Sequence, residues 1–272
     1  MPVAEACSLR GLKPQIELLE AVTRPNSADT KPKREFRTCR SKWPYYRLPV
    51  DWGSQYAHST HLIDTIRGVW ARNIRPMRLS RRPQPFDSEE FIFELKIDGW
   101  RALAVMQAGQ CNLVPRNGNA FRRFVDLRGD ISQRIPDGTV LDGEICCLDE
   151  YGRSIFNDLM SRDKECFFYA FDALFVAGED VRSLPLIRRK EMLRKLIRTR
   201  RSRLLFMDHI ETHGTRLFER ACDLDLEGIV AKRKISVYQA TEKPSAHWIK
   251  IKNPAYTQAQ GRAEMFEQML QR

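Results

Sequence analysis

Lysine, aspartate, glycine and arginine stand close together in one segment of this chain, at a spacing that suits covalent chemistry. Residues 94–101 (ELKIDGWR) predict a strand that ends at Lys96, a turn at the Asp-Gly pair, and a second strand that begins with Arg101. A lysine amine is a nucleophile only when it is neutral, and burial or neighbouring cations lower its pKa. Arg101, Lys250 and Lys252 are candidate neighbours. A surface lysine beside a hairpin turn gives the same short pattern, so this segment alone decides nothing.

Four later segments place charged or aromatic side chains on predicted strands. Residues 141–144 (LDGE) put Glu144 in an apolar strand, and residues 168–172 (FYAFD) put Phe171 in another. Residues 227–232 (EGIVAK) open a strand with Glu227 and end it with a lysine. Residues 248–252 (WIKIK) alternate, which sends Lys250 and Lys252 to the same face of a strand. Each segment also has a structural explanation: an ion-pair partner, plain core, or lysines that protect an exposed sheet edge.

The order and combination of these segments resemble the covalent nucleotidyltransferase superfamily of ATP-dependent DNA ligases, RNA ligases and mRNA capping enzymes. The ordered motifs of that superfamily are KxDGxR, an RNG-like element, a DGE-type strand, an aromatic-Asp strand, an EG-x-x-x-K strand and a final KxK strand. All six occur here in that order, the second at residues 116–118, and the resemblance spans about residues 77–253. The wording ELKIDGWR, FYAFDALF, EGIVAKR and HWIKIKNP is most similar to bacterial ATP-dependent DNA ligases, especially the ligase domains of end-joining proteins. The chain has no GxxxxGK[ST] and no GxGxxG motif, so a P-loop and a Rossmann turn are excluded.

The resemblance implies a role for each matching residue. Lys96 attacks the α-phosphate of ATP and becomes linked to AMP, and Glu227 binds Mg²⁺ or Mn²⁺, which prefer hard oxygen donors. Fixed cations and the metal neutralise the charge that develops during phosphoryl-type transfer. The other implied roles are Glu94 and the Leu95 backbone at the adenine edge, Phe171 on the adenine face, Arg101 and Glu144 at the ribose or strand terminus, Arg116 at a phosphate or sugar, and Lys250 and Lys252 at the α-phosphate.

The implied function is DNA ligation in repair or recombination: adenylation of the enzyme, transfer of AMP to a 5′-phosphate end, and attack by a 3′-hydroxyl that releases AMP. The implied partner is nicked or broken DNA. Two alternatives stay open: an RNA ligase or guanylyltransferase, and a non-sealing module that binds nucleic acid or a partner protein.

The predicted organisation has three parts: a basic extension over residues 1–75, an adenylation domain over residues 76–253, and a helical tail over residues 254–272. Residues 1–87 hold 16 Lys and Arg against 8 Asp and Glu, so most of the net charge of +11 lies there. This excess suits a polyanion, and the low apolar periodicity of residues 25–47 equally suits partial disorder. Ligases follow the KxK strand with an OB-fold domain, and about 20 residues are too few for one. A minimal enzyme, an enzyme that borrows an OB-fold or end-joining partner, and a truncated remnant are all compatible with this.

The alternation of patterns predicts an α+β fold with largely antiparallel sheets flanked by helices. Strands are expected at residues 91–96, 101–107, 139–148, 167–176, 204–210, 228–232 and 248–252, and helices at 14–24, from Ser59 onward, 122–135, 186–198, 215–223 and 264–270. Residues 75–85 are expected to be a linker. No run of eighteen apolar residues and no secretory signal occurs, and the seven cysteines form no CxxC pair. The expected location is the reducing cytoplasm, in association with DNA.

Overall fold

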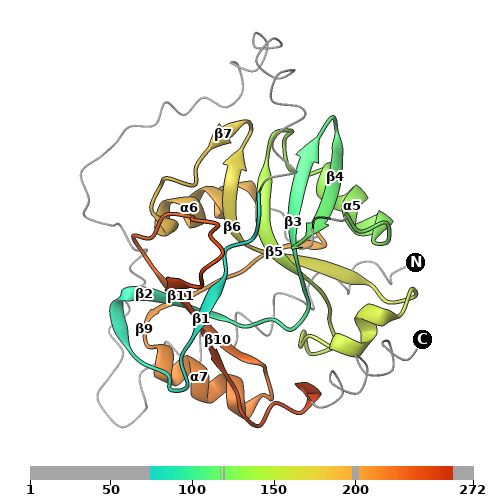
Figure 1. The fold of residues 1–272 in the computed structure, drawn as a ribbon. Helices are drawn as coiled ribbons and strands as arrows, with labels where there is room; N and C mark the ends of the chain where they lie inside the picture. Colours follow the sequence, from blue (N-terminus) through green and yellow to red (C-terminus); the bar gives the residue numbers. More distant parts are fainter. Residues whose placement is uncertain (1–73, 117, 119, 198–201, 260–272) are drawn as a thin grey trace, which may run out of the picture.

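The computed structural model describes residues 74–116, 118, 120–197 and 202–259. This part of the chain folds into two β-sheets that lie against one another, with helices on their outer faces (Figure 1). The predicted helices at residues 14–24, after Ser59 and at 264–270 lie outside the described residues. The predicted α+β class with largely antiparallel sheets is confirmed.

The five-stranded sheet has the order β1-β11-β10-β2-β9, and only the β1–β11 pair is parallel. Its strands are β1 (Leu79–Arg81), β2 (Ser88–Leu95), β9 (Ile210–Thr212), β10 (Gly228–Arg233) and β11 (Ser245–Lys252). Four of these strands are antiparallel neighbours although they come from distant parts of the sequence. The three segments ELKIDGWR, EGIVAK and WIKIK therefore meet in one sheet.

The six-stranded sheet has the order β4-β3-β5-β6-β7, and β8 pairs in parallel with β6. Its strands are β3 (Trp100–Gln107), β4 (Gln110–Pro115), β5 (Val140–Cys147), β6 (Cys166–Val176), β7 (Glu179–Asp180) and β8 (Leu204–Phe206). Strand β6 reads CFFYAFDALFV, an almost continuous apolar run, because it is buried on both faces.

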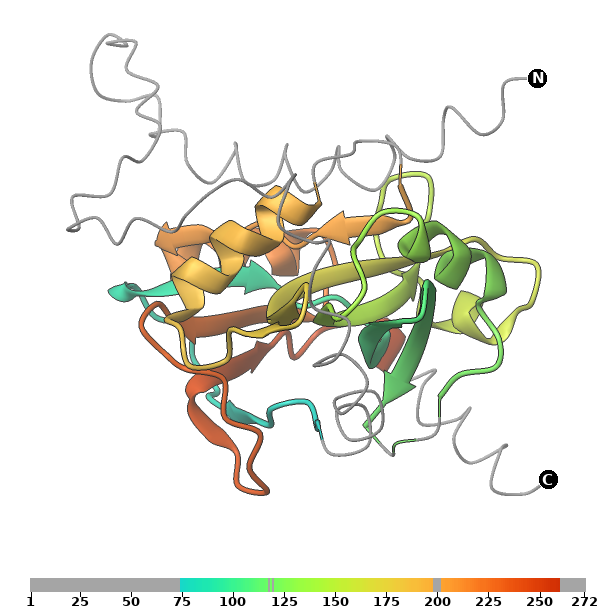
Figure 2. The ribbon, with the colours of Figure 1, turned by 90° about the horizontal axis from the view of Figure 1, so that it is seen from above.

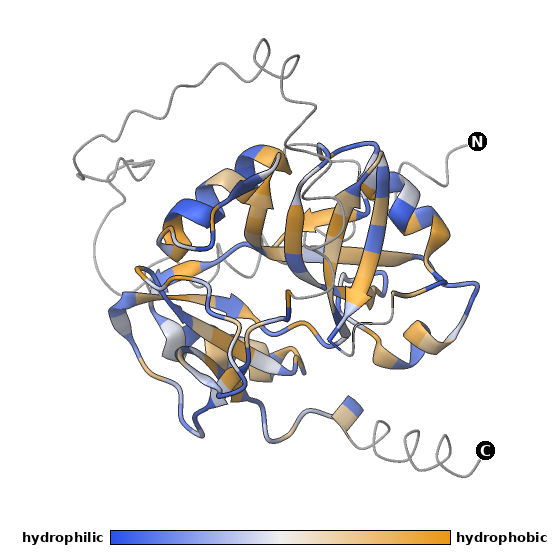
Figure 3. Cartoon of the chain, turned by 45° about the horizontal axis from the view of Figure 1, so that its top comes forward, coloured by the Kyte–Doolittle hydropathy of each residue, from blue (hydrophilic) through white to orange (hydrophobic). Residues whose placement is uncertain are grey.

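Three α-helices and one 3₁₀ turn complete the described fold: α5 (Val125–Ser132), η1 (Phe156–Met160), α6 (Leu186–Leu196) and α7 (Gly214–Asp223). Helix α6 packs on β6, α5 packs on β4, and α7 packs on β10 and β2 (Figures 1 and 2). Figure 3 shows long apolar stretches along the strands of the larger sheet and mixed hydropathy on the helices. Among the residues described, no helix is long and apolar enough to cross a membrane.

One core cluster joins the two sheets. It contains Ile92 of β2 and Trp248 of β11 from the smaller sheet, and Leu103 of β3 and Leu174 of β6 from the larger one. All four are at most 1% exposed. Because this cluster fixes the sheets against each other, side chains at the ends of their facing strands are held at fixed separations.

Several predicted boundaries were wrong. Residues 75–85 are not a free linker, because Leu79–Arg81 form β1 and pair with β11. The predicted strand 204–210 is two strands, β8 and β9, which belong to different sheets. Strand β4 was not predicted, and the predicted helix 122–135 is shortened to Val125–Ser132. Propensity cannot place these breaks, since the sheet that each strand joins decides them.

Candidate active site

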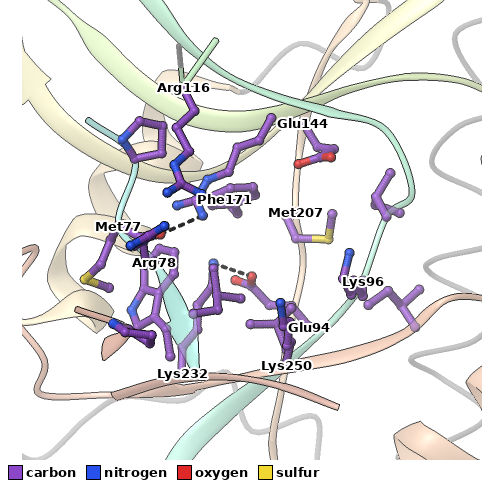
Figure 4. Close-up of a pocket in the computed structure, with 18 residues that line it drawn as sticks. Met77, Arg78, Glu94, Lys96, Arg116, Glu144, Phe171, Met207, Lys232 and Lys250 are labelled. Atoms are coloured by element: carbon purple, nitrogen blue, oxygen red, sulfur yellow. Dashed lines mark hydrogen bonds and ion pairs between the residues drawn. The ribbon is translucent and has the colours of Figure 1, made fainter. Parts of the chain in front are cut away.

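A cavity of about 570 Å³ opens between the two sheets, next to the turn that follows β2. Strands β2, β3, β5, β6, β10 and β11 contribute to its wall, together with residues 76–79 before and within β1. Lys96 and Arg78 lie on opposite sides of it (Figure 4). The cavity is lined by Pro76, Met77, Arg78, Leu79, Glu94, Leu95, Lys96, Ile97, Arg101, Arg116, Glu144, Phe171, Met207, Val230, Lys232, Pro244, Trp248 and Lys250.

Lys96 lies at the rim of this cavity and is bound to Glu227. Its Nζ lies 2.5 Å from Oε2 of Glu227, and Nζ of Lys252 lies 3.0 Å from Oε1. The Glu227 side chain is 3% exposed, whereas those of Lys96 and Lys252 are 21% and 41% exposed. One buried carboxylate therefore holds two lysines that both reach solvent.

Gly228 brings Lys96 and Glu227 together. The backbone N–H of Lys96 donates to the Gly228 carbonyl at 2.9 Å. Gly228 has a φ of 131°, and an added Cβ would collide with the carbonyl oxygen of Ile251 on β11. Only glycine fits this close approach of two strands. This explains the Glu-Gly pair in EGIVAK. The glycine allows β10 to approach β11 closely, and the residue directly before it, Glu227, is thereby placed beside Lys96.

The charges at the rim shift one another's pKa values. Burial would raise the pKa of Glu227, but the ammonium groups of Lys96 and Lys252 outweigh it and hold that pKa below 4.5. Burial lowers the pKa of Lys250, and the nearby Lys252 and Lys96 ammonium groups lower it further. Lys96 and Lys250 therefore line this end of the cavity, and Lys252 lies beside them.

Glu94, deeper in the wall, is bound by two other lysines. Its Oε1 lies 2.5 Å from Nζ of Lys190 on α6, and its Oε2 lies 2.6 Å from Nζ of Lys232 on β10. All three side chains are at most 2% exposed. Burial lowers the pKa of Lys232 to about 8, although Glu94 opposes this shift. Neither lysine was among the predicted site residues.

Arg101 is oriented by a carboxylate that was not predicted. Its guanidinium binds Asp142 through two hydrogen bonds, Nε–Oδ1 at 3.1 Å and Nη2–Oδ2 at 2.7 Å, and donates to the Met77 carbonyl at 2.7 Å. Tyr238 also donates to Asp142, at 2.6 Å. Glu144 is the Cα partner of Arg101 across β3 and β5, but the guanidinium binds Asp142 instead.

Glu144 is half-buried in the cavity wall. Burial raises its pKa to about 8, against the opposing effects of Lys96 and Arg101. The carboxyl is therefore largely protonated at neutral pH and can then donate a hydrogen bond as well as accept one.

Phe171 and Trp248 form an aromatic wall of the cavity. Their rings meet edge to face at 6.0 Å, and Nζ of Lys232 lies 4.1 Å from the Phe171 centroid and 4.0 Å from the Trp248 centroid. Arg101 lies over the same two rings. Trp248 is 1% exposed, so it supports Phe171, the ring that a planar ligand would meet.

Every predicted site residue except Glu227 and Lys252 lines the cavity. Glu227 is bound to Lys96 at the rim, and Lys252 is bound to Glu227. The sequence missed Lys232, although the EG-x-x-x-K pattern marks its position. It also missed Asp142, Lys190 and Arg78. No group of three or more His, Cys, Asp or Glu suited to a metal occurs within the described ranges.

The turn that carries Lys96 is held in place by contacts of Asp98 and Gly99. Asp98 is 1% exposed and accepts a hydrogen bond of 2.9 Å from the hydroxyl of Tyr256, beyond β11. Its N–H donates to Ser154 Oγ at 3.3 Å. An added Cβ at Gly99 would collide with the Ile145 carbonyl oxygen. The KxDG pattern therefore combines a side chain at the cavity with two residues that pack the turn against the sheet.

A family model for the ATP-dependent DNA ligase domain matches residues 78–252. This chain belongs to that family. The match covers the two sheets and every residue assigned to the cavity except Pro76 and Met77.

Related proteins agree with this membership. The SPbeta prophage-derived DNA ligase-like protein LigB of Bacillus subtilis is 31% identical over 195 residues, which is 68% of this chain and 69% of that protein. The multifunctional non-homologous end joining protein LigD of Pseudomonas aeruginosa is 32% identical over 170 residues, which is 60% of this chain and 20% of that protein. The ligase domain therefore corresponds to about a fifth of this second relative.

A solved structure of mycobacterial DNA ligase D complexed with ATP and MES superposes with a TM-score of 0.59 at 27% identity. The match covers 67% of this chain and 61% of the mycobacterial chain. The resemblance inferred from the six motifs, to the ligase domains of end-joining proteins, is confirmed.

Proposed function

We propose that this chain uses Lys96 to take AMP from ATP and passes it to the 5′-phosphate of a nicked or broken DNA end, which a 3′-hydroxyl then seals. One observation carries this proposal: the Lys96 amine lies at the rim of a 570 Å³ cavity, among the charged groups that adenylate transfer requires. Nucleophilic attack at the α-phosphate needs a neutral amine and fixed positive charge around the phosphates.

Glu227 is the proposed switch of contacts at Lys96. Without a ligand its carboxylate binds the Lys96 amine. Once Glu227 binds another positive group, the Lys96 amine is released to attack the α-phosphate, with Lys250 and Lys252 beside it. Lys250 and Lys252 would then stabilise the negative charge on the α-phosphate.

Glu227 fits a role in holding Mg²⁺ or Mn²⁺. It is the carboxylate beside Lys96, its pKa is lowered, and Mg²⁺ in nucleotide sites commonly uses one or two carboxylates plus substrate phosphates. The metal would supply charge neutralisation at those phosphates. A one-carboxylate site is consistent with the lack of a larger acidic cluster among the described residues.

The opposite end of the cavity suits the nucleoside. Phe171 would stack on the adenine face. Both carboxylate oxygens of Glu94 are engaged by lysines, so we assign the adenine edge to the backbone of Glu94 and Leu95. Glu144 and Arg101 would meet the ribose or the DNA terminus, and Arg116 a phosphate or sugar.

Labelling with α-³²P-ATP and Mg²⁺ tests the first step. The wild-type protein is expected to become covalently labelled, and Lys96→Ala to lose labelling entirely. Lys195→Ala, an exposed lysine on α6, is the control and is expected to label as the wild type does. Equal labelling of Lys96→Ala and the control would exclude Lys96 as the nucleophile. Labelling by GTP in place of ATP would favour a guanylyltransferase.

Nick sealing tests the later steps. Pre-adenylated protein is expected to seal nicked duplex DNA, and a nicked RNA duplex serves as the comparison substrate. We also propose that residues 76–253 are the catalytic domain, that basic residues in 1–75 contact DNA, and that an OB-fold or end-joining protein assists closure on DNA inside the cell. Sealing that appears only when such a partner is added would support the last point.

A further inference from the structure

Two cysteines face each other across β5 and β6. Cys147 and Cys166 are Cα partners in the antiparallel register, and their Sγ atoms lie 2.8 Å apart. Both thiols are buried, at 1% and 6% exposure. Directly paired residues on antiparallel strands have Cα separations of about 4.5–5.5 Å, within the range of about 4.4–6.8 Å that disulfides use.

Cys166 also forms part of the wall of a second cavity, of about 660 Å³, lined by residues 122–127, 160–162, Lys164, Cys166 and Arg203. Five of these lining residues are Arg or Lys, against one aspartate, Asp126. Cys166 is therefore the member of the pair that belongs to the wall of a positively charged cavity. Cys147, which is not among the lining residues, lies behind it.

We infer that Cys166 and Cys147 form a hydroperoxide-reactive dithiol, with Cys166 as the attacking thiol and Cys147 as the resolving thiol. The inference concerns a covalent modification site separate from the nucleotide cavity and is independent of the proposed ligase reaction.

The charges around the pair assign the two roles. The sulfur–sulfur contact with Cys147 and the nearby Arg123 and Arg203 guanidinium groups lower the pKa of Cys166, although burial opposes them. The same contact and burial raise the pKa of Cys147, which has no arginine among the groups that shift it. Thiolate is the reactive form, so Cys166 reacts first. Among the five cysteines that the structure describes, the other three have raised pKa values because they are buried.

The chemistry balances in two steps. Cys166 releases its proton to solvent, and the thiolate attacks the terminal oxygen of a hydroperoxide. The O–O bond breaks, Cys166 becomes a sulfenic acid, and the alkoxide or hydroxide takes that proton from solvent and leaves as an alcohol or water. The Cys147 sulfur then attacks Cys166, the S–S bond forms, and the sulfenic oxygen leaves as water with the Cys147 proton. The two thiols lose two electrons in total, and the hydroperoxide gains them.

A disulfide here would close the base of residues 148–165. That segment holds η1 and Ser154, whose Oγ accepts a hydrogen bond from the backbone of Asp98. The disulfide would therefore restrict the motion of residues 148–165, which contact the Lys96 turn through Ser154. A cross-link between strands also constrains the unfolded chain, so the melting temperature should rise on oxidation.

Peptide mapping of the wild-type full chain after brief treatment with hydrogen peroxide tests the site. Trypsin gives one peptide over residues 135–153, which holds both Cys146 and Cys147, and one over residues 165–182, which holds Cys166. We expect these two peptides to become linked, with a loss of two hydrogens. Linkage must persist in Cys146→Ser and disappear in Cys147→Ser, and reduction with dithiothreitol must reverse it. Because the mapping is first made on the wild type, it does not depend on the folding of a variant.

The rate comparison uses Cys222, which is half-buried on α7, as the reference thiol. Cys166 should lose its thiol at least tenfold faster than Cys222, and its alkylation by iodoacetamide should reach half its maximal rate at a lower pH. Three results would each overturn the inference: equal rates for the two thiols, sulfinic acid at Cys166 without linkage, or linkage of Cys166 to Cys7 or Cys39.

Discussion

Two carboxylates in the smaller sheet are each bound by two lysines, and they differ in how far those lysines are buried. Glu94 is held by Lys190 and Lys232, which are 1% and 2% exposed. Glu227 is held by Lys96 and Lys252, which are 21% and 41% exposed. We call these the inner triad and the outer triad.

The comparison shows that the same local chemistry supports two different tasks. In the inner triad no member can exchange its partner for water, so these ion pairs serve the stability of the fold. In the outer triad both lysines can hydrate when Glu227 changes its partner. Lys96 is therefore available for chemistry, whereas the Lys232 ammonium group is held by Glu94 against the aromatic wall.

The largest effect on stability is expected from Glu94→Ala. The substitution leaves two ammonium groups buried without a counter-ion, and breaking a buried ion pair in this way costs about 3–5 kcal/mol. Urea denaturation should show this loss in the free energy of unfolding. Lys195→Ala, on the exposed face of α6, is the control and should change it by less than about 0.5 kcal/mol.

Glu227→Ala is the matched test in the outer triad. The two released lysines reach water, so the loss of stability should be about 1 kcal/mol or less, while lysine adenylation falls strongly. Two quantities are measured for each variant: the free energy of unfolding and the rate of AMP labelling. A stability loss as large as that of Glu94→Ala would remove the distinction between the triads.

The sequence predicted the outer triad far better than the inner one. Lys96, Glu227 and Lys252 stand at motif positions, and their strands were placed within a few residues. Lys190 lies on a helix with no motif, and its ion pair with Glu94 joins residues 96 positions apart. Such a pair depends on how α6 packs on the sheets, which no local pattern encodes.

The same reason explains the other errors. The segment before β2 reads as a basic linker, yet Met77 and Arg78 line the cavity because β1 joins β11 in parallel. Asp142 was not predicted either: Arg101 and Glu144 lie on paired strands and both line the cavity, but the Arg101 guanidinium binds Asp142. Strand alternation predicts which face a residue occupies, and side-chain pairing across the cavity is settled by the three-dimensional contacts.

Asp98 provides an intermediate case, a buried carboxylate near Lys96 that accepts a hydrogen bond from the neutral hydroxyl of Tyr256. Tyr256→Phe removes the hydroxyl that donates to it and should cost about 1–2 kcal/mol of unfolding free energy, since the acceptor stays buried. Adenylation should slow while the KM for ATP stays unchanged, because the turn and not the cavity is loosened. Tyr151→Phe, an exposed tyrosine, is the control. An unchanged rate and stability would show that the Tyr256 contact does not hold the turn.

The last expected effect is a dependence of stability on pH at Glu144. Its folded-state pKa of about 8 lies above the ordinary value of 4.5, so the folded protein binds the proton more tightly than the unfolded chain does. Stability is therefore expected to fall as the pH rises from about 4.5 to about 8, where the half-buried carboxylate becomes charged. Glu144→Gln stays neutral and should raise the melting temperature more at pH 9 than at pH 6. A loss of stability that is the same at pH 6 and pH 9 would contradict this expectation, because it would mean that Lys96 and Arg101 keep the Glu144 carboxylate charged in the folded protein, as the lysines of the outer triad do for Glu227.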